Sequence, residues 1–512
     1  MKSFIRTRRG RCGRRGRLTA IGRWLPFGAL VALFAASSNE ARAYDFSLSL
    51  NTIGQGYQER RYSAGGASEL LSRRRLTQYL NLSVFAIEPE GWRDDQRERN
   101  QISFELGMRF ESDLGQFMLG RPRGPDAIAE LTQNQMDVLF AYFLGRSLWG
   151  SVDVQLGRQV HYDRVDFYSF DGIDALLRAT SLLSARLLAG TEVRGELPLS
   201  APIYESDGTS VGSRDPATRP EQSRAWRPMV GGGLLLDGSS APIPITAQAM
   251  YRRVFSDTFA AQVGDPTSGI NHETVSMTAD AHWGQRIFVT AGARYNLLAG
   301  LSDDQQLAAR VSLGHGHFVS AEYSFLAPTF DGDSIWNVFA AGAHRDWRAG
   351  YDLPIGDGGD TRWRIHARAF WRTFVDPSRE LSDVRAVGRD ATGGKRAFGC
   401  DVGLQGRSQR ARLRLDLYAD GGMGGRKTGG DVSGRWMVDA RYLELEGRAT
   451  AYAWASDDLP QLQTAVIGGL GVGAIYKMSP KIRLHVLAED NRGTYYRAQV
   501  RGLAVLEVDV SL

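Results

Sequence analysis

The sequence has only two cysteines in 512 residues, Cys12 and Cys400. We expect Cys12 to be removed with an N-terminal leader, so no disulfide can form within the remaining chain. Cys400 shares the apolar side of a strictly alternating stretch with Phe398, Val402 and Leu404. This position predicts an inert thiol that faces a core or lipid. The scarcity of cysteine therefore excludes a disulfide-stapled fold.

Long apolar runs are also absent. Beyond residue 43 the sequence has no apolar stretch of about 18 residues, the length that a transmembrane helix needs. The first 43 residues have a basic start, a short apolar run over 25–36 and an A-x-A motif at 41–43. This order predicts that residues 1–43 are a secretory signal peptide and that residues 44–512 form the mature domain.

The excess of positive charge does not belong to the mature domain. The whole chain carries +5, but residues 1–43 hold ten Lys and Arg against the single acid Glu40, a net +9, which leaves −4 for residues 44–512. A nucleic-acid partner is therefore not expected, because the basic patch that such binding needs is lost with the leader.

The mature domain is instead rich in strict alternation. In residues 361–374, TRWRIHARAFWRTF, the even positions are mostly cationic and the odd positions are apolar with a tryptophan at each end. Similar period-two runs recur along the chain, and they predict strands that face two different solvents. Counted separately, the runs exceed 18, and we expect some neighbours to merge. Residues 173–189 also suit a helix, and this alternative stays open.

The strand at 361–374 favours a membrane barrel over a soluble sandwich. Its arginines must face water, because unpaired buried charge costs several kcal/mol. Trp363 and Trp371 lie eight residues apart, roughly 26 Å along a strand and roughly 20 Å when tilted, which is close to the height of a lipid-facing band. A closed barrel pairs every backbone amide within lipid.

The predicted fold class is therefore all-β, a single antiparallel transmembrane β-barrel. About 18 strands would give about 26 residues per strand over residues 44–512, and sixteen to twenty strands also fit. Tight connections near 145–148 and 314–316 alternate with long polar ones, which predicts one smooth rim and one elaborate rim. The long connections are expected at 53–74, 112–133, 199–227, 375–395 and 421–431.

Charged residues that share the polar face of their strands are expected to line the lumen. The basic group comprises Arg364, His366, Arg368, Arg372, Arg410, Arg412 and Arg414, and the acidic group comprises Asp416, Glu444 and Glu446. Two interpretations stay open. In the first, the two groups form a transverse field that guides an anionic solute or polymer; in the second, they are an ordinary solvated lining whose charges pair with one another.

Residues 156–178, LGRQVHYDRVDFYSFDGIDALLR, carry a resemblance to a known family. A strand ending Gly157-Arg158-Gln159, an Asp-rich turn and a strand opened by Phe170-Asp171-Gly172 resemble alginate-export outer-membrane porins. The resemblance implies an 18-stranded barrel that passes an anionic polysaccharide through an Arg-rich lumen. It also implies a lumen-side or rim network. The residues of this network are Arg158, Asp163, Arg164, Asp166 and Asp171.

Other motifs carry little chemistry. Residues 208–212 match G-x-S-x-G but lie in a polar loop, without the strand and helix that a nucleophile elbow needs. His315 and His317 lack an evident third metal ligand. The acidic stretches 331–333 and 356–360 suit turns better than calcium sites. We therefore expect no catalytic residues, no metal and no cofactor.

The leading hypothesis is a channel in the outer membrane of a Gram-negative bacterium for an anionic solute or polymer, with polysaccharide export as its specific form. Expected partners are outer-membrane lipid and lipopolysaccharide, an anionic polysaccharide and a periplasmic export apparatus. The alternatives are a plugged or structural barrel and a general diffusion porin. A gated siderophore receptor is not expected, because the strands begin at Tyr44 and no plug domain precedes them.

Overall fold

The computed structural model describes most of the predicted mature domain. The described residues are 45–63, 68–85, 87, 101–113, 134–193, 227–255, 269–298, 300–327, 343–356, 362–375, 396–423, 425–455, 465–494 and 496–511. Residues 1–43, the predicted signal peptide, lie outside them. No helix within the described part is long and apolar enough to cross a membrane.

The described residues form 22 strands in one sheet. The first eleven are β1 (Asp45–Ser63), β2 (Ser68–Phe85), β3 (Gln101–Asp113), β4 (Asn134–Leu148), β5 (Val152–Tyr162), β6 (Phe167–Arg178), β7 (Leu183–Glu192), β8 (Pro228–Gly238), β9 (Ile245–Phe255), β10 (Ile270–Trp283) and β11 (Ile287–Asn296). The others are β12 (Leu301–Gly314), β13 (His317–Leu326), β14 (His344–Ile355), β15 (Arg362–Phe374), β16 (Arg396–Arg407), β17 (Ala411–Gly422), β18 (Arg426–Asp439), β19 (Leu443–Ala455), β20 (Ala465–Ser479), β21 (Ile482–Gly493) and β22 (Tyr496–Ser511).

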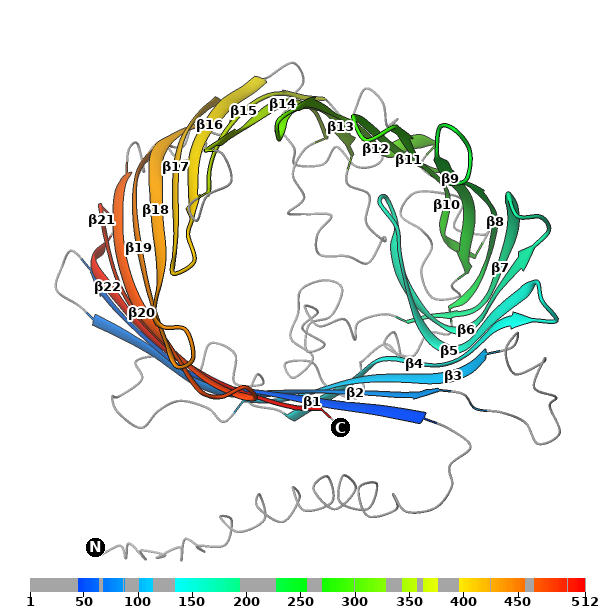
Figure 1. Ribbon diagram of the computed structural model, residues 1–512, viewed down its shortest axis with the longest axis horizontal. Helices are drawn as coiled ribbons and strands as arrows, with labels where there is room; N and C mark the ends of the chain where they lie inside the picture. The colour runs from blue at the N-terminus through cyan, green and yellow to red at the C-terminus, as the bar shows by residue number, and fades with distance from the viewer. Residues whose placement is uncertain are drawn as a thin grey trace, which may run out of the picture. The chain divides into compact units, whose positions relative to one another are not determined.

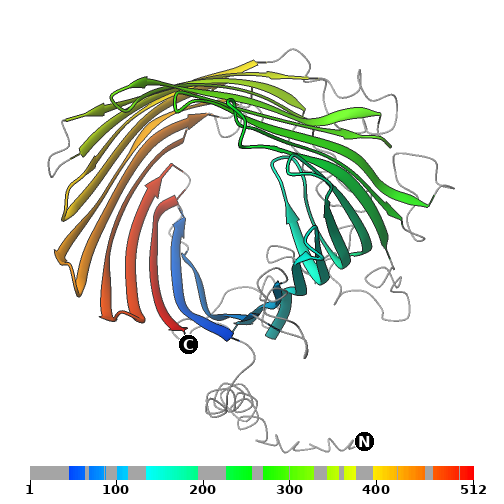
Figure 2. The same cartoon turned by 45° about the vertical axis from the view of Figure 1, so that its right-hand side comes forward.

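The sheet closes on itself. Each strand pairs antiparallel with the next, and β1 pairs with β22 from Ser49↔Ser511 to Tyr62↔Ala498. Figure 1 shows the strands arranged as a ring, and Figure 2 shows that they run obliquely around it. Closure removes the free sheet edge, so the wall can satisfy its backbone groups without water. The prediction of an all-β, single antiparallel barrel is confirmed.

The predicted number of about 18 strands is wrong, because the barrel has 22. The neighbouring runs do not merge, since turns as short as residues 315–316 separate them. Two predicted long loops are mainly strand: β1 and β2 occupy most of 53–74, and β17 and β18 occupy most of 421–431. Polar and glycine-rich strand ends look like loops in a sequence. Residues 173–189 belong to the β6–β7 hairpin and are not helical.

The two ends of the barrel differ, as the rim prediction requires. Connections alternate between the ends because successive strands are antiparallel. One end, the short-turn end, holds the start of β1, the end of β22 and the connections 149–151, 179–182, 239–244, 284–286, 315–316, 356–361, 408–410, 440–442 and 480–481, with 86–100 as the longer exception. The other end, the long-connection end, holds the longer connections 114–133, 193–227, 256–269, 327–343, 375–395 and 456–464, together with the short ones at 64–67, 163–166, 297–300, 423–425 and 494–495. This asymmetry is typical of outer-membrane barrels.

The two faces of the wall also differ. Large apolar side chains such as Leu307, Val402 and Leu417 are exposed on the outer face, while polar side chains occupy the lumen face. The register aligns four outward aromatic side chains on neighbouring strands near the long-connection end. This aromatic belt consists of Tyr323, Trp347, Trp371 and Phe398. Such belts mark the interface between membrane and water.

Candidate functional site

Four arginines stand side by side on the lumen face at the short-turn end. The pairing Arg362↔Arg407, Arg407↔Arg412 and Arg412↔Arg435 sets them at directly opposed positions on β15–β18. We call this row the arginine belt. All four side chains are exposed. Like charges directly opposite one another destabilise a sheet, so the row has a cost that an anionic ligand would relieve.

Few carboxylates neutralise the arginine belt. Arg435 lies 3.2 Å from the Glu446 carboxylate and 3.7 Å from that of Glu444. Within the described part of the chain, Arg362, Arg407 and Arg412 make no ion pair. Most of the belt's positive charge therefore faces the lumen.

Further along the same strands, the predicted basic residues behave in two ways. Arg372 donates two hydrogen bonds to Asp346, at 2.6 and 2.7 Å. His366 is buried, with Nε2 at 3.1 Å from Asp416, which also pairs with Arg414. These side chains are held by carboxylates and offer less charge to a solute.

Arg364 and Arg368 are exposed on the lumen face and make no ion pair with the residues that the structure describes. Arg368 also lines a cavity of about 760 Å³ in the wall. The predicted acidic residues contact basic side chains of nearby strands: Glu444 binds Lys477, and Glu446 binds His485 as well as Arg435. Both interpretations of the lumen charges therefore apply, because some of the predicted charged side chains pair with one another, whereas Arg364 and Arg368 do not.

The β5–β6 hairpin forms a second feature of the lumen. The β4–β5 ladder runs only from Leu148↔Val152 to Ala141↔Arg158, although β5 continues to Tyr162. The hairpin then bends inward, and its tip reaches the inner side of β9–β12, as Figure 1 and Figure 2 show. Gly157 permits the bend: its φ is +131°, and a Cβ there would lie 2.2 Å from the Ala141 carbonyl oxygen.

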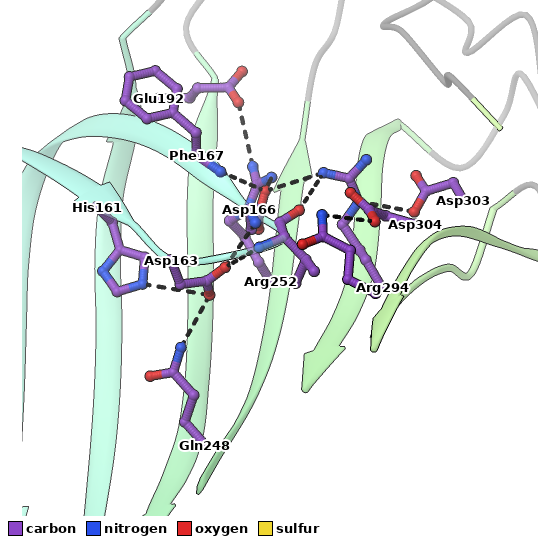
Figure 3. Close-up of polar contacts among 12 residues, drawn as sticks. His161, Asp163, Asp166, Phe167, Glu192, Gln248, Arg252, Arg294, Asp303 and Asp304 are labelled. Carbon is purple, nitrogen blue, oxygen red and sulfur yellow. Dashed lines mark hydrogen bonds and ion pairs between the residues drawn. The ribbon is translucent and has the colours of Figure 1, made fainter. Parts of the chain in front are cut away.

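Charged side chains fasten the hairpin tip to the wall (Figure 3). Arg252 of β9 donates to both carboxylate oxygens of Asp166, at 3.1 and 3.3 Å, and both side chains are buried. Arg294 of β11 donates to the Val165 carbonyl oxygen at 2.8 Å. Arg164 donates to Asp280 of β10 at 2.8 Å. These contacts join residues more than 80 positions apart in the sequence.

The tip also has a compact local structure and a small apolar core. The Asp163 carboxylate accepts hydrogen bonds from the backbone amides of Val165 and Asp166 and from Gln248 of β9. Val165 sits on Gly292, where a Cβ would come within 2.8 Å of the valine. Behind the tip, a buried cluster joins the hairpin to β7, β8 and β9. Its members are Tyr168, Phe170, Leu188, Met229, Met250 and Val254.

The resemblance-based network separates into two parts. Asp163, Arg164 and Asp166 come together at the docked tip. Arg158 and Asp171 pair with one another at 2.8 Å, on the opposite face of the hairpin from the buried side chains. A direct role for any of them in substrate passage stays a prediction.

Several site residues were missed by the sequence reasoning. Arg252 and Arg294 occur in alternating strands without any local sign of a partner, and they become recognisable only when the hairpin docks. Arg362 and Arg407 could have been assigned to the basic wall by parity alone. Their alignment with Arg412 and Arg435 depends on the pairing register, which sequence alternation does not give.

The remaining motifs lie partly outside the residues that the structure describes. The G-x-S-x-G stretch at 208–212 and the acidic stretch 331–333 lie outside the described residues, as does most of 356–360. His315 lies in the β12–β13 turn and His317 opens β13, where His317 Nδ1 lies 2.9 Å from the Tyr351 hydroxyl. Among the described residues, no group of three or more potential ligands could hold a metal ion.

Comparison with known proteins gives similarity only at the level of solved structures. No protein-family model and no curated protein matches the chain. Vanillate-bound OpdK of Pseudomonas aeruginosa is 10% identical, with a TM-score of 0.43, over 91% of this chain and 99% of that one. A BenF-like porin from Pseudomonas fluorescens Pf-5 is 9% identical, with a TM-score of 0.43 and coverage of 91% and 99%. OccAB3 of Acinetobacter baumannii is 11% identical, with a TM-score of 0.42 and coverage of 91% and 100%. Similarity this distant supports neither a shared substrate nor the alginate-export resemblance.

Proposed function

We propose that this protein is a channel in the outer membrane of a Gram-negative bacterium that passes anionic solutes, and that its specific solute is an acidic polysaccharide leaving the cell. The closed antiparallel wall, the apolar outer face and the aromatic belt support a place in the membrane. The asymmetry of the two rims supports an outer-membrane orientation, in which short turns face the periplasm.

The arginine belt is the observation that carries the anionic solute. It lies at the short-turn end, so in this orientation the cations meet a solute that enters from the periplasm. Neighbouring strands are about 4.8 Å apart, so the four arginines span roughly 14 Å around the wall. An extended polyanion can contact several of them at once, whereas a small anion meets one or two. The polymer is therefore the solute that uses the whole row.

The passage mechanism needs no covalent chemistry. Exposed Arg362, Arg407 and Arg412 raise the local concentration of anions at the entrance. Arg364 and Arg368 continue the positive charge along β15, so a chain can exchange one guanidinium contact for the next. Because these side chains are solvated, each contact is weak enough to break. We also propose that a periplasmic export apparatus delivers the polymer to this end.

Single-channel recording in a planar bilayer tests the proposal. We expect an anion-selective current that a polyuronate blocks from the short-turn side. Replacing Arg407 and Arg412 by Gln removes two solvated contacts of roughly 0.5–1 kcal/mol each, so the block should become about five- to thirtyfold weaker. Arg492→Gln is the matched control, because Arg492 pairs with Asp490 outside the belt.

The same recording separates the rival functions. An anion-selective current without polyuronate block would support small-anion diffusion and contradict polymer export. The docked β5–β6 hairpin is the feature that favours a plugged barrel, and an absence of current would support that function instead.

A further inference from the structure

Three arginines project from the outer face of the barrel at the level of the aromatic belt or just beyond it. Arg345 and Arg396 lie two residues from the belt members Trp347 and Phe398, towards the long-connection end. They flank Thr373 in one row of the sheet. Arg426 opens β18, and its Cβ lies 3.9 Å from the position of a Cβ on outward-facing Gly421, next to Phe398. All three side chains are exposed.

Local contacts show how these arginines are held. The Arg396 guanidinium lies over the ring of Trp371, 5.5 Å from its centroid. The Arg345 guanidinium lies over the ring of Phe325 at 5.7 Å. A guanidinium over an aromatic ring is attracted by the ring's π face, and the Arg396 guanidinium can still donate its N–H groups to an anion. The aromatic belt therefore orients cations as well as anchoring the barrel.

Three other arginines on the outer face differ from Arg396 and Arg426 because a carboxylate neutralises each of them. Arg158 pairs with Asp171, Arg253 with Glu273 and Arg492 with Asp490. Within the part of the chain that the structure describes, Arg396 and Arg426 make no ion pair with a carboxylate. A charge that faces lipid without a counter-ion is costly, so these positions require an anion from outside the protein.

The height of the three arginines along the barrel wall, relative to the aromatic belt, identifies the source of that anion. An aromatic belt lies at the headgroup level of a membrane. One outward-facing step beyond the belt adds roughly 7 Å along the strand, which places a guanidinium among the headgroups. The long-connection end faces outward in this class of barrel, so the headgroups are those of the outer leaflet.

We propose that Arg345, Arg396 and Arg426 form a binding site for the phosphate groups of lipopolysaccharide. Arg345 and Arg396 are two strands apart, about 10 Å, so they can hold separate phosphates or two sides of one headgroup. The planar guanidinium binds phosphate oxygens in pairs, which an ammonium group cannot do. This inference rests on the proposed place in the outer membrane but not on the proposed solute.

Lipid binding by the purified full chain in detergent tests the site. Native mass spectrometry would count bound lipopolysaccharide on the wild type, on the Gln variant (Arg345→Gln, Arg396→Gln and Arg426→Gln together) and on the matching Lys variant. We expect binding about tenfold weaker for the Gln variant, equivalent to about 1.4 kcal/mol, and intermediate for the Lys variant. The lumen variant with Arg407→Gln and Arg412→Gln is the control and should bind as the wild type does.

Further probes identify the ligand group. Dephosphorylated lipopolysaccharide and phosphatidylcholine should bind at the level of the Gln variant. Equal binding of native and dephosphorylated lipopolysaccharide, or wild-type binding by the Gln variant, would overturn the proposal. So would competition by millimolar inorganic phosphate, because it would indicate a free-anion site rather than a lipid site.

The channel function can fail separately. In a bilayer without lipopolysaccharide, the Gln variant should conduct and select anions as the wild type does. If polyuronate blocked neither the wild type nor the variants while lipopolysaccharide still bound to the wild type, only the proposed solute would be contradicted. A Gln variant that fails to fold would be recognised by its lost β-sheet circular dichroism, and the Lys variant would then provide the test.

Discussion

Asp166 and Arg252 form a buried ion pair across the lumen side of the barrel, 86 residues apart in the sequence, with 6% and 7% of their side chains exposed. The pair fastens the tip of the β5–β6 hairpin to β9. Arg294 approaches the same carboxylate at 3.7 Å, and Arg252 also lies over the ring of Tyr168. One carboxylate therefore serves two arginines of the wall and is one of several contacts that hold the hairpin inside the lumen.

Asp166→Asn should release the hairpin tip. The substitution leaves Arg252 with only Glu192, at 3.5 Å, and Arg294 with only Asp303, at 2.8 Å, and breaking a buried pair costs at most about 3–5 kcal/mol. We expect rapid proteolytic cleavage near residues 163–166 and a noisier channel current. Asp171→Asn is the control, because the Arg158–Asp171 pair is partly exposed and is worth at most about 1 kcal/mol. Equal protease resistance of the two variants would show that other contacts hold the tip.

Gly157→Ala should impair folding of the barrel. The residue adopts a left-handed φ of +131°, and its new Cβ would meet the Ala141 carbonyl oxygen at 2.2 Å. A strained backbone alone costs about 1–3 kcal/mol, and the clash adds to this. Gly150→Ala is a matched control, since Gly150 also has a positive φ of 84° but open space around it. The yield of heat-resistant folded barrel should fall further for Gly157→Ala, and equal yields would contradict this account of the bend.

Asp346→Asn should increase anion selectivity. Asp346 is 1% exposed and binds both Arg372 and Arg348. Loss of its charge leaves both arginines with positive charge that solutes can sense. Arg372→Gln should change selectivity in the opposite direction, because it removes a cation from the same face. Reversal potentials across a salt gradient measure both effects, and a shift of the same sign in both variants would contradict the prediction.

The Cys400 thiol should be accessible from the lipid and not from the lumen. It lies on the outer face of β16, between Ala369 of β15 and Ala419 of β17, and it is exposed. A maleimide that partitions into the bilayer should label it, whereas a charged maleimide added from either side should not. Gln405→Cys in a Cys400→Ser background gives the lumen-facing comparison, because Gln405 is partly exposed and lies opposite the lumen-facing Arg364. Labelling of Cys400 by the charged reagent would place this face of the strand in water and contradict the barrel orientation.

Alternation by itself identified the class of fold. Polar and apolar side chains alternate along the chain, and no apolar run is long enough for a transmembrane helix. A closed sheet is then the arrangement that satisfies the backbone hydrogen bonds in lipid. The strand at 362–374 shows this well, because its two faces have opposite character in both the sequence and the structure. The strand count was harder to obtain. A polar strand end such as that of β1 has the composition of a loop, so its length became visible only through its partner β22.

The sequence therefore determined what each side chain faces, since a period of two residues is a local property of an extended chain. Only the tertiary structure decided which side chains meet. The arginine belt requires four strands to pair in one register, and a shift of a single residue would move each arginine to the opposite face. The docking of Asp166 on Arg252 requires a hairpin to leave the wall and cross to a distant strand. Both depend on contacts between remote parts of the chain, which local patterns do not encode.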